Sequence, residues 1–269
     1  MSFLTANARD SGVVTWRNLM NVRRQPDLLL GATLQPIMFV LLFAYVFGGS
    51  IGPNPDAYRE FLMGGIFAQT VAFNSAYTTI GMAADLEKGI IDRFRSLPMS
   101  RAAVLLGRTT SDLVVSAIGL LVMSICGLIV GWRIRGSVVD AIIGYAMLLL
   151  FSFAMSWIGA WIGMVAGSVQ VAQSAGFIWM FPVTFISSAF VSASSMPGPL
   201  RVFAEWNPIT AVADGARELF GNDRPGNLSA APDIWPAENA IFYAFASCVV
   251  ILVVFMPIAV SKYRKVASK

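Results

Sequence analysis

The chain has 269 residues, of which 57% are hydrophobic and only 13% are charged. Soluble domains carry roughly 25% charged residues, so this composition excludes an ordinary soluble protein and indicates a membrane protein with several spans. The formal net charge of +4 does not indicate a nucleic-acid partner, because the basic residues lie beside apolar runs, where membrane orientation explains them better.

Residues 1–27 are polar and basic and contain one amphipathic stretch. Its apolar residues would share one face of a helix: Val13, Trp16, Leu19 and Met20. We therefore expect an interfacial helix that lies in the headgroup plane, with Trp16 as its anchor. A signal peptide is excluded, since the apolar run that follows is too long and lacks a small-residue cleavage site.

The sequence predicts an all-α fold with six membrane-spanning helices in one transmembrane domain, residues 28–260, followed by a tail at 261–269. Each span is expected where an apolar run approaches the length of about 20 residues that a bilayer core requires. The six runs are residues 28–47, 61–83, 113–130, 141–166, 174–191 and 240–260. Pro36 should kink the first span, a feature that membrane helices tolerate.

The second predicted span carries a polar stripe, formed by Thr70, Asn74 and Thr78 at helical spacing. Such a stripe should face protein or a wet pathway rather than lipid. Hydrogen bonding between helices is the commoner reason for it, and a substrate pathway lined by spans one, two and five is the alternative. At the start of the third span, Arg108 and Asp112 are four residues apart and are expected to pair.

Three glycines recur every four residues at the end of the fourth predicted span: Gly159, Gly163 and Gly167. Small residues at this spacing let two helices approach closely. The partner helix could belong to the same subunit or to a second one, and we favour the same subunit.

A charged segment, Asp85–Arg101, separates the second and third predicted spans. Its apolar residues recur on one side of a helix, Gly89 interrupts the pattern and Pro98 ends it. The segment therefore predicts a short amphipathic helix that docks onto a protein or lies on the bilayer surface. A solvated loop whose basic residues only fix topology is the alternative.

The longest loop, residues 192–237, predicts two short amphipathic helices at membrane depth. In the second one, Asn207 is a good N-cap, Pro208 suits the first helical position, and Gly221 followed by Asn222 can end the helix. An apolar stripe runs along it: Ile209, Val212, Ala216 and Leu219. We expect this stripe to pack on the membrane bundle or on a second subunit.

The distribution of basic residues predicts the orientation. The N-terminus, the loop around residues 84–108 and the tail hold thirteen of the nineteen Lys and Arg residues. Because basic residues favour the cytoplasmic side, both termini should be cytoplasmic and the long loop external. This orientation would place the chain in a plasma membrane of the bacterial type.

Several kinds of chemistry have no basis in the sequence. It contains no P-loop, no nucleophile elbow and no histidine, and its two cysteines lie inside apolar runs. We therefore expect no catalytic residue, no metal site and no bound cofactor. Ionisable residues are nearly absent from the six spans, which disfavours an ion-coupled transporter, so the energy should come from a partner.

Two stretches resemble the ABC-2 type transporter permeases, and most closely the daunorubicin-resistance-like membrane subunits. The first is Glu87–Gly89, then Arg93, then Leu97–Arg101, which resembles the cytoplasmic signature of that family. The second is Phe203–Pro208, followed by Asp214, Arg217 and Phe220, which is similar to the external re-entrant segment before the last span.

The resemblance implies a permease that exports drug-like or lipid-like molecules, using ATP and magnesium bound by two copies of a separate ATPase subunit. It also implies a second permease subunit, identical or related. The residues expected to dock the ATPase are Trp16, Arg17, Glu87, Lys88, Gly89, Arg93, Phe94, Arg95, Leu97 and Pro98. Those expected at an outer gate are Phe203, Trp206, Asn207, Pro208, Ile209 and Val212.

Three other functions are compatible with the sequence. A polysaccharide or lipid-linked glycan exporter would share these motifs, and a non-transporting assembly or regulatory subunit would share the composition. A membrane enzyme is the weakest alternative, because the sequence offers little acid–base machinery.

Overall fold

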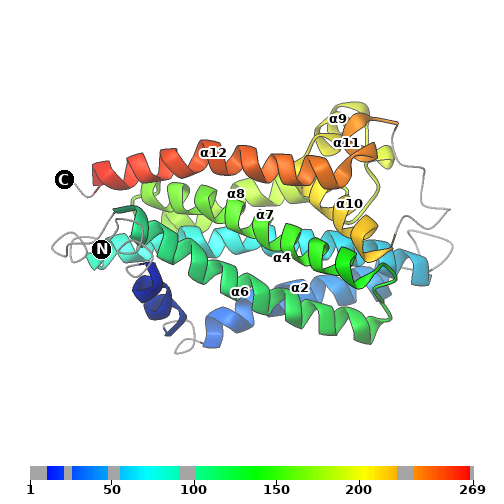
Figure 1. The fold of residues 1–269 in the computed structure, drawn as a ribbon, viewed down its shortest axis with the longest axis horizontal. Helices are drawn as coiled ribbons and strands as arrows, with labels where there is room; N and C mark the ends of the chain where they lie inside the picture. The colour runs from blue at the N-terminus through cyan, green and yellow to red at the C-terminus, as the bar shows by residue number, and fades with distance from the viewer. Residues whose placement is uncertain (1–10, 21–25, 48–54, 91–100, 223–232, 267–269) are drawn as a thin grey trace.

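The computed structural model describes residues 11–20, 26–47, 55–90, 101–222 and 233–266, and the secondary structure in these ranges is helical (Figure 1). A helix at 11–20 comes first. The long helices are α2 (Pro26–Leu41) with the π-helical η1 (Leu42–Phe47), α4 (Pro55–Glu87), α6 (Arg101–Val130), α7 (Val138–Val165), α8 (Val169–Phe185) and α12 (Ala240–Val266). The short ones are η2 (Ala193–Ser195), α9 (Gly198–Glu205), α10 (Pro208–Phe220) and α11 (Trp235–Glu238).

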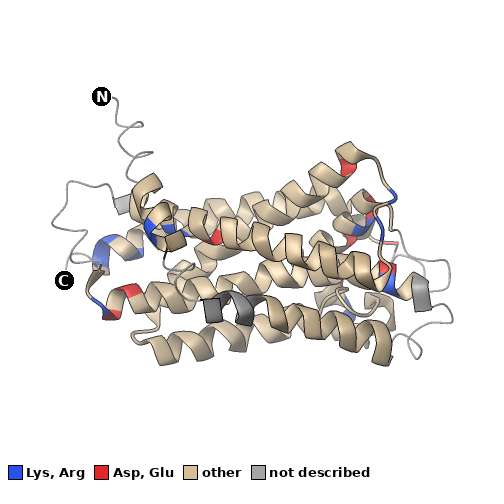
Figure 2. Ribbon diagram, turned by 90° about the horizontal axis from the view of Figure 1, so that it is seen from below, with Lys and Arg blue, Asp and Glu red and all other residues tan. Residues whose placement is uncertain are grey.

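The long helices run back and forth along one axis, and α9, α10 and α11 lie together at one end (Figure 1). The helix at 11–20 and the last turns of α12 lie at the opposite end. We call these the outer end and the inner end of the bundle. Charged residues gather at both ends (Figure 2).

The predicted all-α membrane fold is confirmed in its helical character. Within the described ranges, three stretches are long and apolar enough to cross a membrane, Ala103–Val130, Val138–Val165 and Ala240–Val266, and Thr33–Val46 is a shorter apolar helix. The number of six spans stays a prediction. α4 is the central helix, because it packs against α6, α7, α8 and α10, and every residue from 61 to 76 is buried. Its polar residues therefore face protein rather than lipid.

α6 runs from Arg101 to Val130, so the third predicted span, residues 113–130, lies within it, and Arg108 and Asp112 lie in the part of the helix that precedes that span. One predicted boundary is wrong. α8 begins at Val169 and ends at Phe185, whereas the sequence predicted residues 174–191. The early start has a local cause: Gly167, at φ +75°, ends the preceding helix, and the Ser168 hydroxyl then accepts a hydrogen bond from the Val171 amide.

The glycine ridge packs within the chain, as predicted, but only two of its three residues take part. A Cβ at Gly159 or Gly163 would overlap a backbone carbonyl of α4, at Ser75 and Thr79 respectively. Gly167 was wrongly included in the ridge: it has no neighbour within 4 Å of its Cβ position and forms the turn between α7 and α8. Glycine therefore sets the close approach of α7 to the central helix.

Candidate functional site

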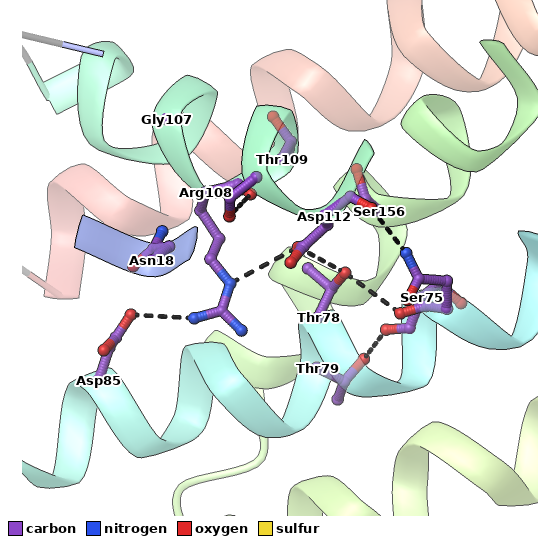
Figure 3. A network of polar contacts seen from close by, with 12 residues as sticks. Asn18, Ser75, Thr78, Thr79, Asp85, Gly107, Arg108, Thr109, Asp112 and Ser156 are labelled. Atoms are coloured by element: carbon purple, nitrogen blue, oxygen red, sulfur yellow. Dashed lines mark hydrogen bonds and ion pairs between the residues drawn. The ribbon is translucent and has the colours of Figure 1, made fainter. Parts of the chain in front are cut away.

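Four charged side chains form successive ion pairs at the inner end of the bundle, and we call them the ionic chain: Arg17, Asp85, Arg108 and Asp112. Figure 3 shows the last three of them. Arg17, from the helix at 11–20, lies 3.3 Å from the Asp85 carboxylate near the end of α4. Arg108 of α6 lies 3.3 Å from the same carboxylate through Nη1 and 3.5 Å from Asp112 through Nε. The predicted pairing of Arg108 with Asp112 is confirmed, and Asp85 links it to the N-terminal helix.

Hydrogen bonds extend from Asp112, the last member of the ionic chain, toward the middle of the bundle. Thr78 Oγ1 donates to Asp112 Oδ2 at 2.8 Å, and Asn74 Nδ2 donates to the Asp112 carbonyl at 2.9 Å and to Ser116 Oγ at 2.5 Å. Ser116 in turn bonds Ser152 of α7. Asn74 and Thr78 therefore join α4 to α6, and the polar stripe serves contacts between helices.

Glycines make room for the ionic chain on both sides of Arg108. A Cβ at Gly81 would overlap the Arg108 guanidinium. A Cβ at Gly107 would come within 2.6 Å of Val14 and 2.8 Å of the Ser11 carbonyl, and Thr15 Oγ1 donates to the Gly107 carbonyl at 3.1 Å. The helix at 11–20 is thus seated directly on α6, with Val14 and Asn18 buried.

The residues predicted to dock an ATPase have different surroundings. Trp16 is 68% exposed, on the face of its helix opposite Val14. Glu87 accepts a hydrogen bond from the Val169 amide at 2.7 Å and so caps α8, Lys88 is exposed, and Gly89 forms a turn at φ +61°. The rest of the predicted docking segment, Arg93, Phe94, Arg95, Leu97 and Pro98, lies outside the described residues.

A small open cavity of about 30 Å³ lies between α2, α4 and α6. Two residues of the predicted pathway, Thr70 and Asn74, line it, whereas Thr78 is fully buried and does not. The walls of the cavity come from α2, α4 and α6, whereas spans one, two and five are the ones predicted to line a pathway, and that prediction stays untested. Phe39, Phe73 and Tyr77 give it an aromatic lining, Gln69 adds a neutral polar group, and the described lining contains no charged side chain.

At the outer end, Asn207 holds two helices. As predicted, it caps α10: its Oδ1 accepts a hydrogen bond from the Ile209 amide at 2.9 Å, and Gly221 ends the helix at φ +69°. Its Nδ2 also donates to the carbonyls of Val183 and Ile186, at 2.6 and 2.8 Å, and so satisfies the end of α8.

The apolar stripe of α10 is buried, with Ile209 at 1% and Val212 at 0% exposure, because α10 packs on α4, α7 and α12. Of the two partners expected for the stripe, the structure shows the helix bundle of the same chain. Phe203 and Trp206, from the same predicted gate, are 50% and 54% exposed.

Arg217 is the residue of the outer end that reasoning from residue patterns missed. It is only 2% exposed, and it lies 2.6 Å from Asp214. Its guanidinium donates to the carbonyls of Phe61, Ser188 and Ala189 at 2.7, 2.9 and 3.1 Å. It also lies 3.5 Å from the centre of the Phe61 ring. An arginine within an apolar helix, three residues after an aspartate, was the available signal.

Comparison with known proteins agrees with this architecture. The ABC-2 type transporter family matches residues 10–220. The daunorubicin resistance permease DrrB1 of Streptomyces coeruleorubidus is 32% identical over 205 residues, which cover 76% of this chain and 72% of that protein. The probable doxorubicin resistance permease DrrC of Mycobacterium tuberculosis is 20% identical over 94% of this chain and 88% of its own length.

A putative transport permease of Cyanophora paradoxa, ycf38, is 22% identical over 78% of this chain and 73% of its own length. The family match covers most of the chain, and it includes the ionic chain at the inner end and the α10 segment at the outer end. The protein therefore belongs to the ABC-2 type transporter family, as an integral membrane permease subunit.

Proposed function

We propose that this permease exports an amphipathic, drug-like or lipid-like molecule, driven by ATP hydrolysis in two copies of a separate ATPase subunit. The uncharged cavity between α2, α4 and α6 carries the proposal. Aromatic rings beside neutral hydrogen-bonding groups suit a ligand with an apolar body and a few polar atoms. Ions and highly charged sugars would have no counter-charge among the described lining residues.

The cavity is far smaller than the roughly 300–1,000 Å³ of a typical ligand pocket. We therefore assign this structure to a closed state, in which the helices around the cavity must separate before cargo enters. A second permease subunit, identical or related, would complete the route. The names of DrrB1 and DrrC support drugs of the daunorubicin type as first candidates for cargo.

The ATPase would bind at the inner end, where the exposed Trp16 and the segment following Glu87 lie. We assign that end to the cytoplasm, with both termini, in a bacterial-type plasma membrane. ATP and magnesium would be held by the partner, and this chain would supply docking surfaces and the pathway.

Only part of the outer gate that the sequence suggested is a good candidate for the moving part. Arg217 ties α10 to α4 and to the segment after α8, so these elements should move as one body. The exposed side chains of α9, Leu200, Val202 and Phe203, are then the better candidates for the movable lid.

The test is ATP-driven uptake of daunorubicin by inside-out vesicles that contain the permease and its cognate ATPase. Uptake should require ATP and should vanish when the ATPase carries a substitution of its catalytic glutamate. If ATP is hydrolysed but neither daunorubicin nor a fluorescent phospholipid moves, the export proposal fails in favour of a regulatory subunit or a glycan exporter.

A further inference from the structure

The last turns of α4 hold three other elements. Asp85 receives Arg17 from the helix at 11–20 and Arg108 from α6. One helical half-turn later, Glu87 caps the first turn of α8. The end of α4 is therefore the point at which the helix at 11–20, α6 and α8 are joined. Figure 3 shows one of these contacts, between Asp85 and Arg108.

The Asp85 carboxylate is an unusual choice if its role is stability alone. Its side chain is 18% exposed, and those of Arg108 and Asp112 are 17% and 13% exposed. Pairing charges that are largely removed from water adds little net stability compared with apolar packing, because the desolvation cost offsets the attraction. Ionisable groups inside a membrane bundle are therefore first considered as parts of the mechanism.

Arg108 contacts two carboxylates at the same time, at similar distances of 3.3 Å from Asp85 and 3.5 Å from Asp112. If Arg17 moves with its helix, the charge balance at Asp85 changes, and Arg108 would shift toward one carboxylate or the other. A shift toward Asp112 would act on Thr78, which hydrogen-bonds the same carboxylate oxygen. Coupling between sites requires an element with two discrete states, and Arg108 between its two carboxylates is the candidate for that element.

We propose that Asp85 is a positioning residue for energy coupling: it passes movement of the helix at 11–20 to α6 through Arg108. The inference rests on the proposed function, because it takes that helix as part of the ATPase-facing surface. Asp85 itself contacts neither cargo nor nucleotide.

The first readout does not depend on the identity of the cargo. Spin labels are attached at Leu121→Cys on α6 and Val249→Cys on α12, both exposed positions outside the cavity lining, after replacement of Cys126 and Cys248. In the complex with its ATPase, trapping with ATP and vanadate should change the distance between the labels. Asp85→Asn should abolish that change although the ATPase still binds and hydrolyses ATP.

The second readout is daunorubicin uptake per ATP hydrolysed in vesicles of phosphatidylethanolamine and phosphatidylglycerol. Coupling free energies between sites correspond to roughly 5–150-fold effects, so Asp85→Asn should lower this ratio by roughly fivefold or more. Asp85→Glu, which keeps the charge, should restore most of it. Glu60→Gln is the matched control, because it removes a carboxylate that pairs with Arg135 at the other end of the bundle.

The outcomes separate the two proposals. A label distance that responds to ATP in Asp85→Asn as in the parent protein overturns the coupling role, whatever is transported. Failure of the parent protein to transport daunorubicin bears on the proposed cargo and leaves the distance measurement decisive. If Asp85→Asn does not accumulate in the membrane, Arg17→Gln tests the same link from a side chain that is 30% exposed, and a normal response there also overturns the inference.

Discussion

At the scale of the residue, the Asn207 side chain caps two helix ends, the start of α10 and the end of α8. Its oxygen serves the start of α10, and its nitrogen serves two carbonyls at the end of α8. The bond at the start of α10 is buried and those at the end of α8 are partly buried, and a carbonyl removed from water without a partner is costly. The residue therefore fixes the angle at which the outer segment meets the fifth long helix.

This double role gives a prediction that an ordinary N-cap would not satisfy. Aspartate caps helices as well as asparagine does, so Asn207→Asp should be neutral if capping α10 were the only function. We expect Asn207→Asp to be at least as damaging as Asn207→Ala, because a carboxylate would face the Val183 and Ile186 carbonyls. Each variant should lose about 2 kcal/mol of stability. Thermal unfolding in detergent measures this, and an unchanged midpoint for Asn207→Asp would contradict the double role.

Arg217 is the second residue on which the outer end depends. Arg217→Met should destabilise the fold by roughly 3–5 kcal/mol, since it removes the cation from a buried pair and the donors from three carbonyls. Arg217→Lys should recover only part of the lost stability, because an ammonium group cannot match the hydrogen bonds of the planar guanidinium.

The loss of stability in the Arg217 variants is measured by the yield of protein in the membrane and by the midpoint of thermal unfolding. Arg135→Met is the control: Arg135 also pairs with a carboxylate at this end, but its side chain is 62% exposed, and its variant should behave like the parent protein. Equal yields and thermal midpoints for the Arg217 and Arg135 variants would show that the buried contacts of Arg217 do not stabilise the outer end.

At the scale of the element, the close contact of α7 with α4 depends on glycine. We expect Gly163→Ala to lower stability by about 1–3 kcal/mol, because the new methyl group would meet the Thr79 carbonyl and Met82 Cβ, and backbone cannot yield as a side chain can. Gly176→Ala is the matched control on α8, where the added Cβ would lie 3.4 Å from Ala76, an ordinary contact distance. Thermal midpoints that fall equally in both variants would mean that α7 packs less tightly on α4 than we infer.

The elements also explain what could be predicted from sequence. Asn207, Pro208 and Gly221 are local signals whose meaning depends on a few neighbours, and α10 has the predicted ends. The bounds of α8 were wrong because they were placed by apolar length alone, whereas the helix begins at the Ser168 cap and ends where Asn207 binds the Val183 and Ile186 carbonyls. Asp85 could not be assigned a role, because its partners lie 68 and 23 residues away along the chain.

At the scale of the whole molecule, the two ends of the bundle differ in kind. The inner end has an ionic chain that joins the helix at 11–20, α4 and α6 through pairs with two candidate arrangements. The outer end has Arg217 enclosed by carbonyls and a short helix packed into the bundle. If an ATPase drives the molecule from the inner end, as we propose, this asymmetry would provide an adjustable junction where force enters and a rigid body where the route opens.

The last prediction concerns the orientation of this asymmetric molecule. Thirteen of the nineteen basic residues lie in the N-terminus, the loop around residues 84–108 and the tail, so these parts should face the cytoplasm. In a background without Cys126 and Cys248, a membrane-impermeant maleimide applied to sealed cells should label Asn227→Cys but not Arg93→Cys or Lys265→Cys.

Permeabilising the cells serves as the control for that experiment, because all three positions should then react. Labelling of Arg93→Cys in sealed cells would invert the molecule and place the ionic chain outside. The ATPase could not then reach the helix at 11–20, and the coupling role of Asp85 would fail together with the orientation. If the orientation is as predicted, the driving subunit can act only on the end that the positive charges hold in the cytoplasm, and the positions of the basic residues would then be tied to the direction of transport.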